Sequence, residues 1–557
     1  MKGYLLPGAS ALAMIAAVPA LAQSNESDVT QTGANSTIAV TQSGTDGKST
    51  VTQGGIQNRA TLIQSGSENE STAIQDDGTG SSDDNNTASV TQSGSKNISV
   101  VSQTNDFGTA TVVQENIGND SNLSQSGDLD TATVSQTGAD NESDLAQSGN
   151  LNAANITQAG DRNASTLTQS SGLNQAVVNQ DGADNTLLAS QEGVGANTMN
   201  VLQDGDDNTA DIIQGGAGNG AGTTAAAGVI QSGNEGSVTI RQTGGLHTAF
   251  AEQKGGDLNI ASIDQGANTS SDHTAAIRQD GSRNDATIGQ RGFNQAADLR
   301  QIGDDNRADV EQGGGIGRNH NAFVTQDGDR NGADILQGGE NQTATITQTG
   351  NDNAADIDQG RDRLAGIPGQ FDTDFGSGQV ASITQTGGGN TASTVQRGEN
   401  QSATIQQVGD NNVGSGTFLF GAQIIQSGDG GENNAASIMQ LSSGNQALTT
   451  QDGNSLAANV TQGGSGGNTS TVMQSGAGGA VLLNADVLQN GADNTSTIDQ
   501  GGTDQTANVD QLGEDNLSDI IQTGSGHTAT VTQNSILNQS FVTQTGTGHI
   551  VIVTQGS

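Results

Sequence analysis

The chain has 557 residues, of which 30% are hydrophobic and 2% aromatic, with 82 glycines and neither cysteine nor tryptophan. Its 60 acidic and 17 basic residues give a net charge of −43. This composition is typical of disordered chains and cannot build an ordinary large core. The charge argues against nucleic-acid binding, which depends on Lys and Arg that displace counterions from phosphate. The lack of cysteine excludes disulfides, thiol catalysis and zinc–thiolate sites.

Residues 1–22 have the features of a secretory signal peptide. Lys2 gives a positive start, residues 5–18 form an apolar stretch, and Ala20-Leu21-Ala22 matches a cleavage pattern of small residues. A membrane anchor would need about 20 uninterrupted apolar residues, whereas this stretch contains proline and glycine near its start. We therefore predict cleavage before Gln23, export of the mature chain, and no stable transmembrane segment.

Over residues 23–557 one short unit repeats almost without a break. Glutamine recurs every eleven residues in most of the chain, and we count 44 units, with 32 of 43 intervals equal to eleven and the others longer. Aligned on the glutamine, the unit is Q-x-G-x-x-N-x-A-x-[IV]-x. A fixed period of this kind is the signature of a stacked repeat architecture.

The spacing inside the unit predicts a strand and a bend. Asn353, Ala355, Ile357 and Gln359 are two residues apart and therefore share one face of an extended strand. The residue two before the glutamine is Val, Ile or Leu in 39 of the 44 units, which marks the core position. A period of two and β-branched residues exclude a helix. The glycine two after the glutamine, followed by Asp, Asn or Gly, predicts a tight bend.

Such short strands bury too little to fold alone, so the units must stack. We predict an all-β fold, a β-solenoid in which two 11-residue units form each 22-residue rung. A single buried amide is costly, but a column of amides in register lets each side chain bond to the next. We predict inward ladders of this kind, formed by Gln31, Gln42, Gln53, Gln64, Gln136, Gln147, Gln158, Gln169, Gln337, Gln348, Gln359, Gln522, Gln533 and Gln544, and by Asn58, Asn69, Asn141, Asn152, Asn163, Asn174 and Asn353.

Two features interrupt the regular repeat. Longer intervals predict loops inserted into the stack near residues 76–86, 215–226, 360–380 and 408–422. The last strand is apolar on both faces, which predicts either a docking strand or a strand sealed by a terminal contact. Its residues are Ile550, Val551, Ile552 and Val553.

The unit resembles the repeat of the curlins, which are the subunits of curli, the amyloid fibres of bacterial surfaces. The resemblance covers nearly the whole mature chain and fixes the Gln, Gly, Asn and small-residue positions together. It implies secretion, self-assembly into extracellular fibres, and a role in biofilm matrix and surface adhesion. It also implies partners besides other copies of the chain, namely a nucleator homologue and an outer-membrane curli-type secretion pore. This chain departs from typical curlins in having many more repeats and a much larger negative charge.

Catalysis is not expected, and neither is a cofactor or a metal. Carboxylates occur everywhere, so no pair stands out as a general acid and base. The five histidines show no metal-ligand spacing, and we interpret them as solvated bend residues; their positions are His247, His273, His320, His527 and His549. Calcium-binding and ice-binding solenoids both have more regular outward arrays than this one. The alternative to a fibre subunit is a secreted or surface β-solenoid that does not polymerise and binds a ligand, ice or a host surface.

Overall fold

The computed structural model describes residues 24–76, 84–104, 106–193, 195–217, 220–221, 228–266, 271–313, 317–360, 376–413, 421–427, 432–476 and 481–556. The predicted signal peptide and the central parts of the predicted insertions lie outside these residues. Every element of the described part is a strand. This part of the chain accordingly has no helix long and apolar enough to cross a membrane.

The chain divides into two compact units, residues 1–264 and 265–557. In the first unit the odd-numbered strands form one sheet up to β17, followed by β20. We call it sheet 1; it consists of β1 (Glu26–Gln31), β3 (Lys48–Gln53), β5 (Glu70–Gln75), β7 (Ile98–Gln103), β9 (Asp120–Gln125), β11 (Glu142–Gln147), β13 (Ala164–Gln169), β15 (Thr186–Glu192), β17 (Thr209–Ala217) and β20 (Ser237–Gly245). Sheet 2 of this unit consists of β2 (Thr37–Thr45), β4 (Arg59–Ser67), β6 (Thr87–Ser95), β8 (Thr109–Ile117), β10 (Thr131–Ala139), β12 (Ala153–Asp161), β14 (Gln175–Ala183), β16 (Thr198–Asp204), β18 (Gly220–Ala221), β19 (Val229–Asn234) and β21 (Thr248–Asp257).

The second unit repeats this plan, and β22 (Ile260–Gln265) spans the junction. Its sheet 1 consists of β24 (Asp285–Gln290), β26 (Arg307–Gln312), β28 (Gly332–Gln337), β30 (Ala354–Gln359), β32 (Thr391–Gln396), β34 (Ala422–Ser427), β36 (Gln446–Asp452), β38 (Thr469–Ser475), β40 (Thr495–Thr503), β42 (Leu517–Ser525) and β44 (Gln539–Thr547). Its sheet 2 consists of β23 (Thr274–Asp280), β25 (Ala296–Ile302), β27 (Asn321–Asp327), β29 (Thr343–Thr349), β31 (Val380–Thr386), β33 (Ser402–Val408), β35 (Ala435–Gln440), β37 (Leu456–Gly466), β39 (Leu483–Ala492), β41 (Gln505–Gln511), β43 (Thr528–Gln533) and β45 (Ile550–Gln555).

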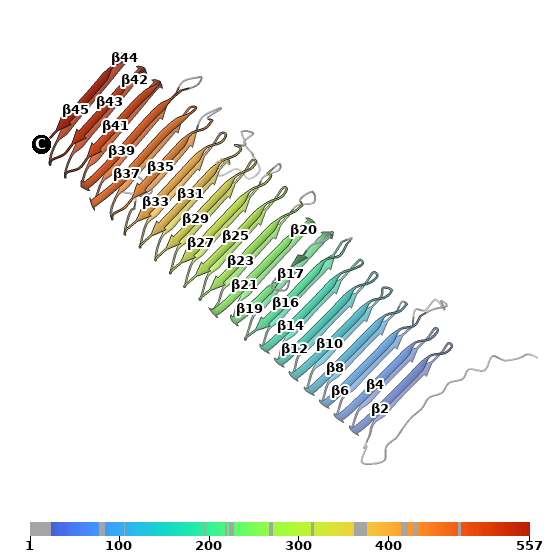
Figure 1. Cartoon of the computed structure of the whole chain (residues 1–557). Coiled ribbons are helices and arrows are strands. Elements are labelled where there is room, and N and C mark those ends of the chain that lie inside the picture. The colour runs from blue at the N-terminus through green and yellow to red at the C-terminus, as the bar shows by residue number, and fades with distance from the viewer. Residues whose placement is uncertain are drawn as a thin grey trace, which may run out of the picture. The chain divides into compact units, whose positions relative to one another are not determined.

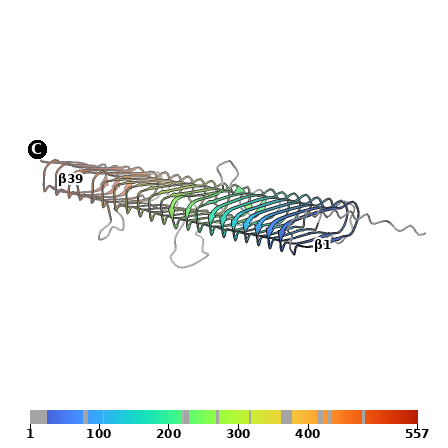
Figure 2. The same cartoon turned by 90° about the horizontal axis from the view of Figure 1, so that it is seen from below.

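Within each unit, each internal strand pairs in parallel with the strands one turn before and one turn after it. In β10, for example, Val134 pairs with Val112 and Ile156, and Gln136 pairs with Gln114. Within each unit the strands of a sheet run side by side in chain order (Figures 1 and 2). The predicted fold is confirmed: the chain forms a parallel β-solenoid of about 22 stacked turns, with paired strands roughly 22 residues apart.

The register is kept across the longer intervals. Gln348 and Gln385 are 37 residues apart in the chain, yet they occupy paired positions on β29 and β31. After a longer interval the next strand therefore returns to the same columns.

The alternation of each strand divides its side chains between the interior and the outer face. On β10 the inward residues Ala132, Val134 and Gln136 are buried, whereas the outward Thr131 is exposed. The interior therefore contains one small residue, one aliphatic residue and one glutamine from each strand. A buried aliphatic of this size contributes about 1.5–3 kcal/mol, so the core is narrow and the polar columns inside it must be hydrogen-bonded.

Many bends have two positions with a left-handed backbone. After β12, Gly160 has φ of 97° and Arg162 has φ of 56°. A Cβ atom on Gly160 would overlap the carbonyl oxygen of Gly182 one turn further on. Glycine is therefore needed at the first position for its small size as well as its φ, whereas the second accepts other residues, most often Asp or Asn.

Candidate functional site

The inward glutamines of each unit form two continuous ladders, one in each sheet. In every described pair the Nε2 atom donates to the Oε1 atom of the glutamine one turn later, at 2.7–3.0 Å apart from the first bond, Gln31 to Gln53, at 3.4 Å. The ladders therefore have a direction, with donors toward the C-terminal side and acceptors toward the N-terminal side. Buried amides repeated in register satisfy one another in this way.

Each glutamine also holds the neighbouring sheet in place. The Nε2 atom of Gln158 donates to the Gln180 side chain at 2.8 Å, to the Glu142 carbonyl oxygen at 2.8 Å and to the Asn163 carbonyl oxygen at 3.0 Å. Glu142 begins β11 and Asn163 directly precedes β13, both in the opposite sheet, so one side chain links both sheets and two turns. The structure places all the predicted glutamines in these ladders: Gln31, Gln42, Gln53, Gln64, Gln136, Gln147, Gln158, Gln169, Gln337, Gln348, Gln359, Gln522, Gln533 and Gln544.

The asparagines lie six residues before the glutamines, where the chain leaves a bend. Asn141 Nδ2 donates to Asn119 Oδ1 at 3.0 Å and to the carbonyl oxygen of Gly160 at 2.8 Å, and Asn141 Oδ1 accepts the backbone N–H of Asn163 at 3.0 Å. Their main partners are thus backbone groups of the bends, in addition to other asparagines. All the predicted asparagines are buried at this position: Asn58, Asn69, Asn141, Asn152, Asn163, Asn174 and Asn353.

The two sheets differ at this bend position in the second unit. In sheet 1 eleven described turns in succession carry Asn, from Asn284 to Asn538, and each accepts the backbone N–H of the next. In sheet 2 the same position carries His273, Gln295, His320, Gln342, Gln379 and Gln401 on consecutive turns. The 11-residue consensus hides this difference, which becomes visible when alternate units are compared.

The interpretation of the histidines as solvated bend residues is wrong for four of the five. His247, His273, His320 and His527 are fully buried because they replace the inward asparagine six residues before a glutamine. The sequence contained this signal in their spacing from Gln253, Gln279, Gln326 and Gln533. Burial lowers the pKa of His320 to about 4, so its imidazole is neutral at neutral pH. His549, on the last turn, is exposed, and its ring stacks on His527 with centroids 5.2 Å apart.

Asp130 is a buried carboxylate in the same position of sheet 2 in the first unit. Its Oδ1 atom accepts the backbone N–H of Asn152 at 2.9 Å, whereas its Oδ2 atom has no hydrogen-bond partner. Burial raises the pKa of Asp130 to about 6, against the opposing effect of its hydrogen bonds from Asn152. Asp130 therefore places an ionisable carboxyl group at the bend position where most turns have a neutral amide.

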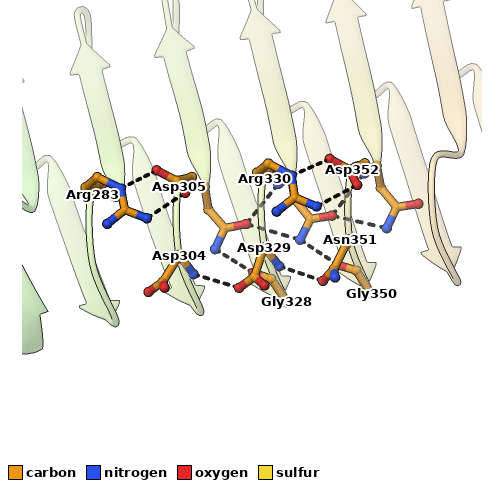
Figure 3. A network of polar contacts seen from close by, with 12 residues as sticks. Arg283, Asp304, Asp305, Gly328, Asp329, Arg330, Gly350, Asn351 and Asp352 are labelled. Carbon is orange, nitrogen blue, oxygen red and sulfur yellow. Dashed lines mark hydrogen bonds and ion pairs between the residues drawn. The ribbon is translucent and has the colours of Figure 1, made fainter.

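Some charged side chains outside the core are paired between successive bends (Figure 3). Arg283 makes a bidentate contact with Asp305, and Arg330 makes one with Asp352, at 2.6–2.9 Å. Hydrogen bonding to these guanidinium groups lowers the pKa of Asp305 and Asp352. Beside them, Asp329 Oδ1 accepts the backbone N–H of Asp304 at 2.9 Å. Asp is thus used at the bends both as an ion-pair partner and as a backbone acceptor.

The last turn of the given chain is apolar on both sides. Ile550 and Ile552 are 72% and 73% exposed, and the inward Val551 and Val553 are partly exposed. β45 pairs with β43 on one edge, and no other described strand lies on its second edge. No Asp, Glu, Lys or Arg occurs from residue 520 onward. The strand predicted as a docking strand therefore presents an open, uncharged edge.

The described residues contain no group of three or more His, Cys, Asp or Glu side chains arranged to hold a metal ion. What the fold does contain is a narrow interior of repeated, mutually bonded amides running through stacked turns. These features define a structural repeat protein, in which every turn repeats the same hydrogen bonds.

Comparison with known proteins agrees with this class. The family model of the curlin associated repeat matches residues 117–149, 281–314, 296–328, 328–360 and 502–534, about a quarter of the chain. These five matches support an assignment to the curlin-repeat family. That family is structural rather than enzymatic, and its members are extracellular or associated with the cell surface. No curated protein matches the chain.

Proposed function

We propose that this protein is a secreted, curlin-like structural subunit that stacks end to end into extracellular amyloid fibres, for biofilm matrix and surface adhesion. The observation that carries the proposal is the directed glutamine ladder, which every turn extends in the same register. A second copy added to the last turn would extend both ladders and both sheets without any change of geometry.

The two end turns are complementary in hydrogen bonding. On β44 and β45, the Nε2 atoms of Gln544 and Gln555 bond to main-chain oxygens and lack the glutamine acceptor found one turn later elsewhere. On β1 and β2, the side-chain oxygens of Gln31 and Gln42 are at the acceptor ends of their ladders. Only stacking of the last turn on the first turn of another copy joins donors to acceptors.

The side chains of the end turns also match in that register. Val553 would pair with Val40, Val551 with Ile38, and Val542 with Val29, so aliphatic residues meet at the core positions. The last turn has no charged residue to face Glu26 and Asp28 on β1. The contact therefore avoids the like-charge repulsion that stacking acidic turns would bring.

The proposal is tested with the chain from residue 23 onward, incubated without denaturant and followed by electron microscopy and fibre diffraction. We expect fibres with a meridional spacing of about 4.7–4.8 Å. Replacing Val551 and Val553 by Asp should abolish growth, because these inward side chains would face Ile38 and Val40 of the next copy and the two carboxylates would be buried at the contact.

The matched control is Leu488→Asp, which adds a carboxylate to the outer face of β39, an internal strand of the same sheet. This variant should still form fibres. Separate particles at all salt concentrations and pH values would contradict the fibre role and favour a solenoid that binds a ligand or surface as a single molecule.

A further inference from the structure

In the first unit, the outer face of sheet 2 from β2 to β16 is almost free of charge. On β2, β4, β6, β8, β10, β12, β14 and β16, the outward positions are five, three and one residues before the ladder glutamine. Arg59 on β4 is the only charged residue at these positions. The others are mainly Thr, Ser and Asn, with Ala, Val, Ile and Leu among them. Acidic residues of these strands, such as Glu115 and Asp161, lie beyond the glutamine, at the bends.

Sheet 1 of the same unit is different. At the corresponding outward positions of β1 to β15 it carries six acidic residues and Lys48, and Asp120, Glu142 and Asp144 lie close together on β9 and β11. The burial of Asp120 and its repulsion by Glu142 and Asp144 raise its pKa. Two strands of one 22-residue turn thus have opposite surface character, although their inward residues follow the same consensus.

A row of bulky apolar residues borders the neutral face. Phe107, Leu129, Leu151 and Leu173 stand two residues before β8, β10, β12 and β14, and are 45–51% exposed. All four have positive φ, between 60° and 67°. At the corresponding bend position most other turns have Asp, Asn or another polar residue. A bulky side chain in this backbone region is strained, so these turns combine local strain with exposed apolar surface.

The neutral face is large enough for a specific interface. A strand segment of six residues at about 3.3 Å per residue is about 20 Å long, and eight strands at about 4.8 Å cover about 38 Å. The product, about 760 Å², is close to the roughly 800 Å² that each partner contributes to a standard protein interface.

We propose that this face is a lateral interface, on which a second copy of this chain packs the same sheet face to face. In a chain with a net charge of −43, two copies approach each other with least repulsion where charges are missing. The β-branched side chains of two such sheets can interlock at about 10 Å sheet spacing. A pair related by a twofold axis also places the Phe107, Leu129, Leu151 and Leu173 row of each copy at the border of the contact.

The interface is tested in a chain whose end-to-end growth is blocked by Val551→Asp and Val553→Asp, measured from residue 23 onward by sedimentation velocity. We expect dimers, and we expect Thr111→Glu with Asn155→Glu to raise the dissociation constant about 100-fold or more, because like charges would face each other across the contact. The matched control is Thr72→Glu with Thr166→Glu, which adds the same charge at the same outward position of sheet 1 on β5 and β13. The control should dimerise as the parent does, and circular dichroism should show the same strand content in all three proteins.

A second measurement locates the contact. The chain has no cysteine, so Thr133→Cys, near the middle of the neutral face, and Thr166→Cys, on sheet 1, each introduce a single thiol. A short bismaleimide should link two copies through residue 133 and leave residue 166 unlinked.

The proposal is overturned if the end-blocked chain stays monomeric up to about 0.1 mM, a concentration at which a standard interface is formed, or if both pairs of Glu substitutions weaken the dimer equally. These outcomes are independent of fibre growth. If the unblocked chain forms fibres but the end-blocked chain forms no dimers, the lateral interface is refuted and the proposal of end-to-end stacking stands. If dimers form without fibres, the proposal of end-to-end stacking fails and the lateral interface stands.

Discussion

The inward position six residues before each ladder glutamine shows how much a single residue can vary in this fold. Asn satisfies the bend through both its oxygen and its nitrogen, as Asn141 does with Asn163, Asn119 and Gly160. His527 reproduces part of this, since its Nε2 bonds to the Thr523 carbonyl oxygen at 3.1 Å and its Nδ1 accepts the backbone N–H of His549 at 3.3 Å. Asp130 reproduces only the acceptor half, and it alone among these residues introduces a buried carboxylate.

The substitution Asp130→Asn should stabilise the turn around β10 at neutral pH. The pKa of Asp130 is raised from 3.8 to about 6 in the folded state, so folding favours the protonated form. Below pH 3.8 the raised pKa therefore leaves the free energy of unfolding unchanged. As the pH rises toward 6 it lowers the free energy of unfolding progressively, and above pH 6 it lowers it by about 3 kcal/mol. Hydrogen-exchange protection of the amides of Thr109 and Asn152, corrected for intrinsic rates, should rise in the variant at pH 7 and remain unchanged at pH 4.

Asp128→Asn is the matched control, since it removes the same charge from an exposed bend where Asp128 Oδ1 accepts the backbone N–H of Asp106. The control should not change protection at either pH. Equal protection in Asp130→Asn and the parent at pH 7 would show that the buried carboxylate carries no penalty.

Gln158→Leu should destabilise β10, β12 and β14. The change removes the ladder bonds of Gln158 to Gln136 and Gln180 and its bonds to the main-chain oxygens of Glu142 and Asn163. Gln136 Nε2 keeps its main-chain acceptors, but Gln180 Oε1 loses its ladder donor, and an unsatisfied buried group costs about 1–3 kcal/mol. We expect hydrogen-exchange protection in these strands to fall by about 2–5 kcal/mol. Gln175→Leu, which alters an outward glutamine on β14, should have little effect, and a similar loss in both variants would argue against a special role for the ladder.

At the scale of the strand and bend, stability depends on how closely successive bends can stack. The glycine two after the ladder glutamine often has its backbone directly against the same bend one turn later, as in Gly138, Gly160 and Gly182. These contacts are between backbones, so no side chain can move aside. The spacing of the turns is therefore determined as much by glycine as by the strand hydrogen bonds.

Gly160→Ala should disrupt the local stack by more than the ordinary difference between glycine and alanine. The added Cβ would overlap the Gly182 carbonyl oxygen at a residue whose φ is already 97°. Gly332→Ala on β28 is the control, because a Cβ there meets no atom within 4 Å. Proteolysis under native conditions should cut the first variant faster near residue 160, and no increase would show that the bend can widen without cost.

At the scale of the whole molecule, charge works against assembly. Pairs such as Arg162–Asp184 neutralise a few bends, but 17 basic residues cannot offset 60 acidic ones. Copies that stack or pack side by side bring their acidic bends closer together, and the energy of this repulsion depends on pH and on screening by salt. Assembly is therefore expected to be limited by electrostatics rather than by the shape of the contact.

Fibre growth should become faster as the pH is lowered toward the sequence pI of about 4.1, because protonation of exposed carboxylates reduces repulsion. Adding salt at pH 7 should shorten the lag phase in the same direction. Thioflavin fluorescence, followed in parallel with electron microscopy, measures the lag. A lag that does not change with pH or salt would show that charge is not the barrier.

The sequence by itself determined the strand positions, the inward columns and the solenoid fold, because one 11-residue period constrains every unit in the same way. The alternation around Gln158 and the glycine at each bend are local signals that need no knowledge of distant residues. The same regularity made the columns of Gln and Asn predictable as ladders, since only stacked amides can be buried at so many positions.

The sequence predicted two units per turn, so that alternate units share a column, but only the tertiary structure decided which side chains are buried in each column and which meet across turns. Successive units alternate between two sheets, so the residues that contact each other are 22 or more apart, and the difference between the Asn column of sheet 1 and the His and Gln column of sheet 2 appears only after this assignment. The burial of His320 and Asp130, the pairing of Arg330 with Asp352, and the contrast between a neutral and an acidic outer face all follow from it. Each depends on which side chains meet across turns, and that is determined by stacking rather than by the consensus.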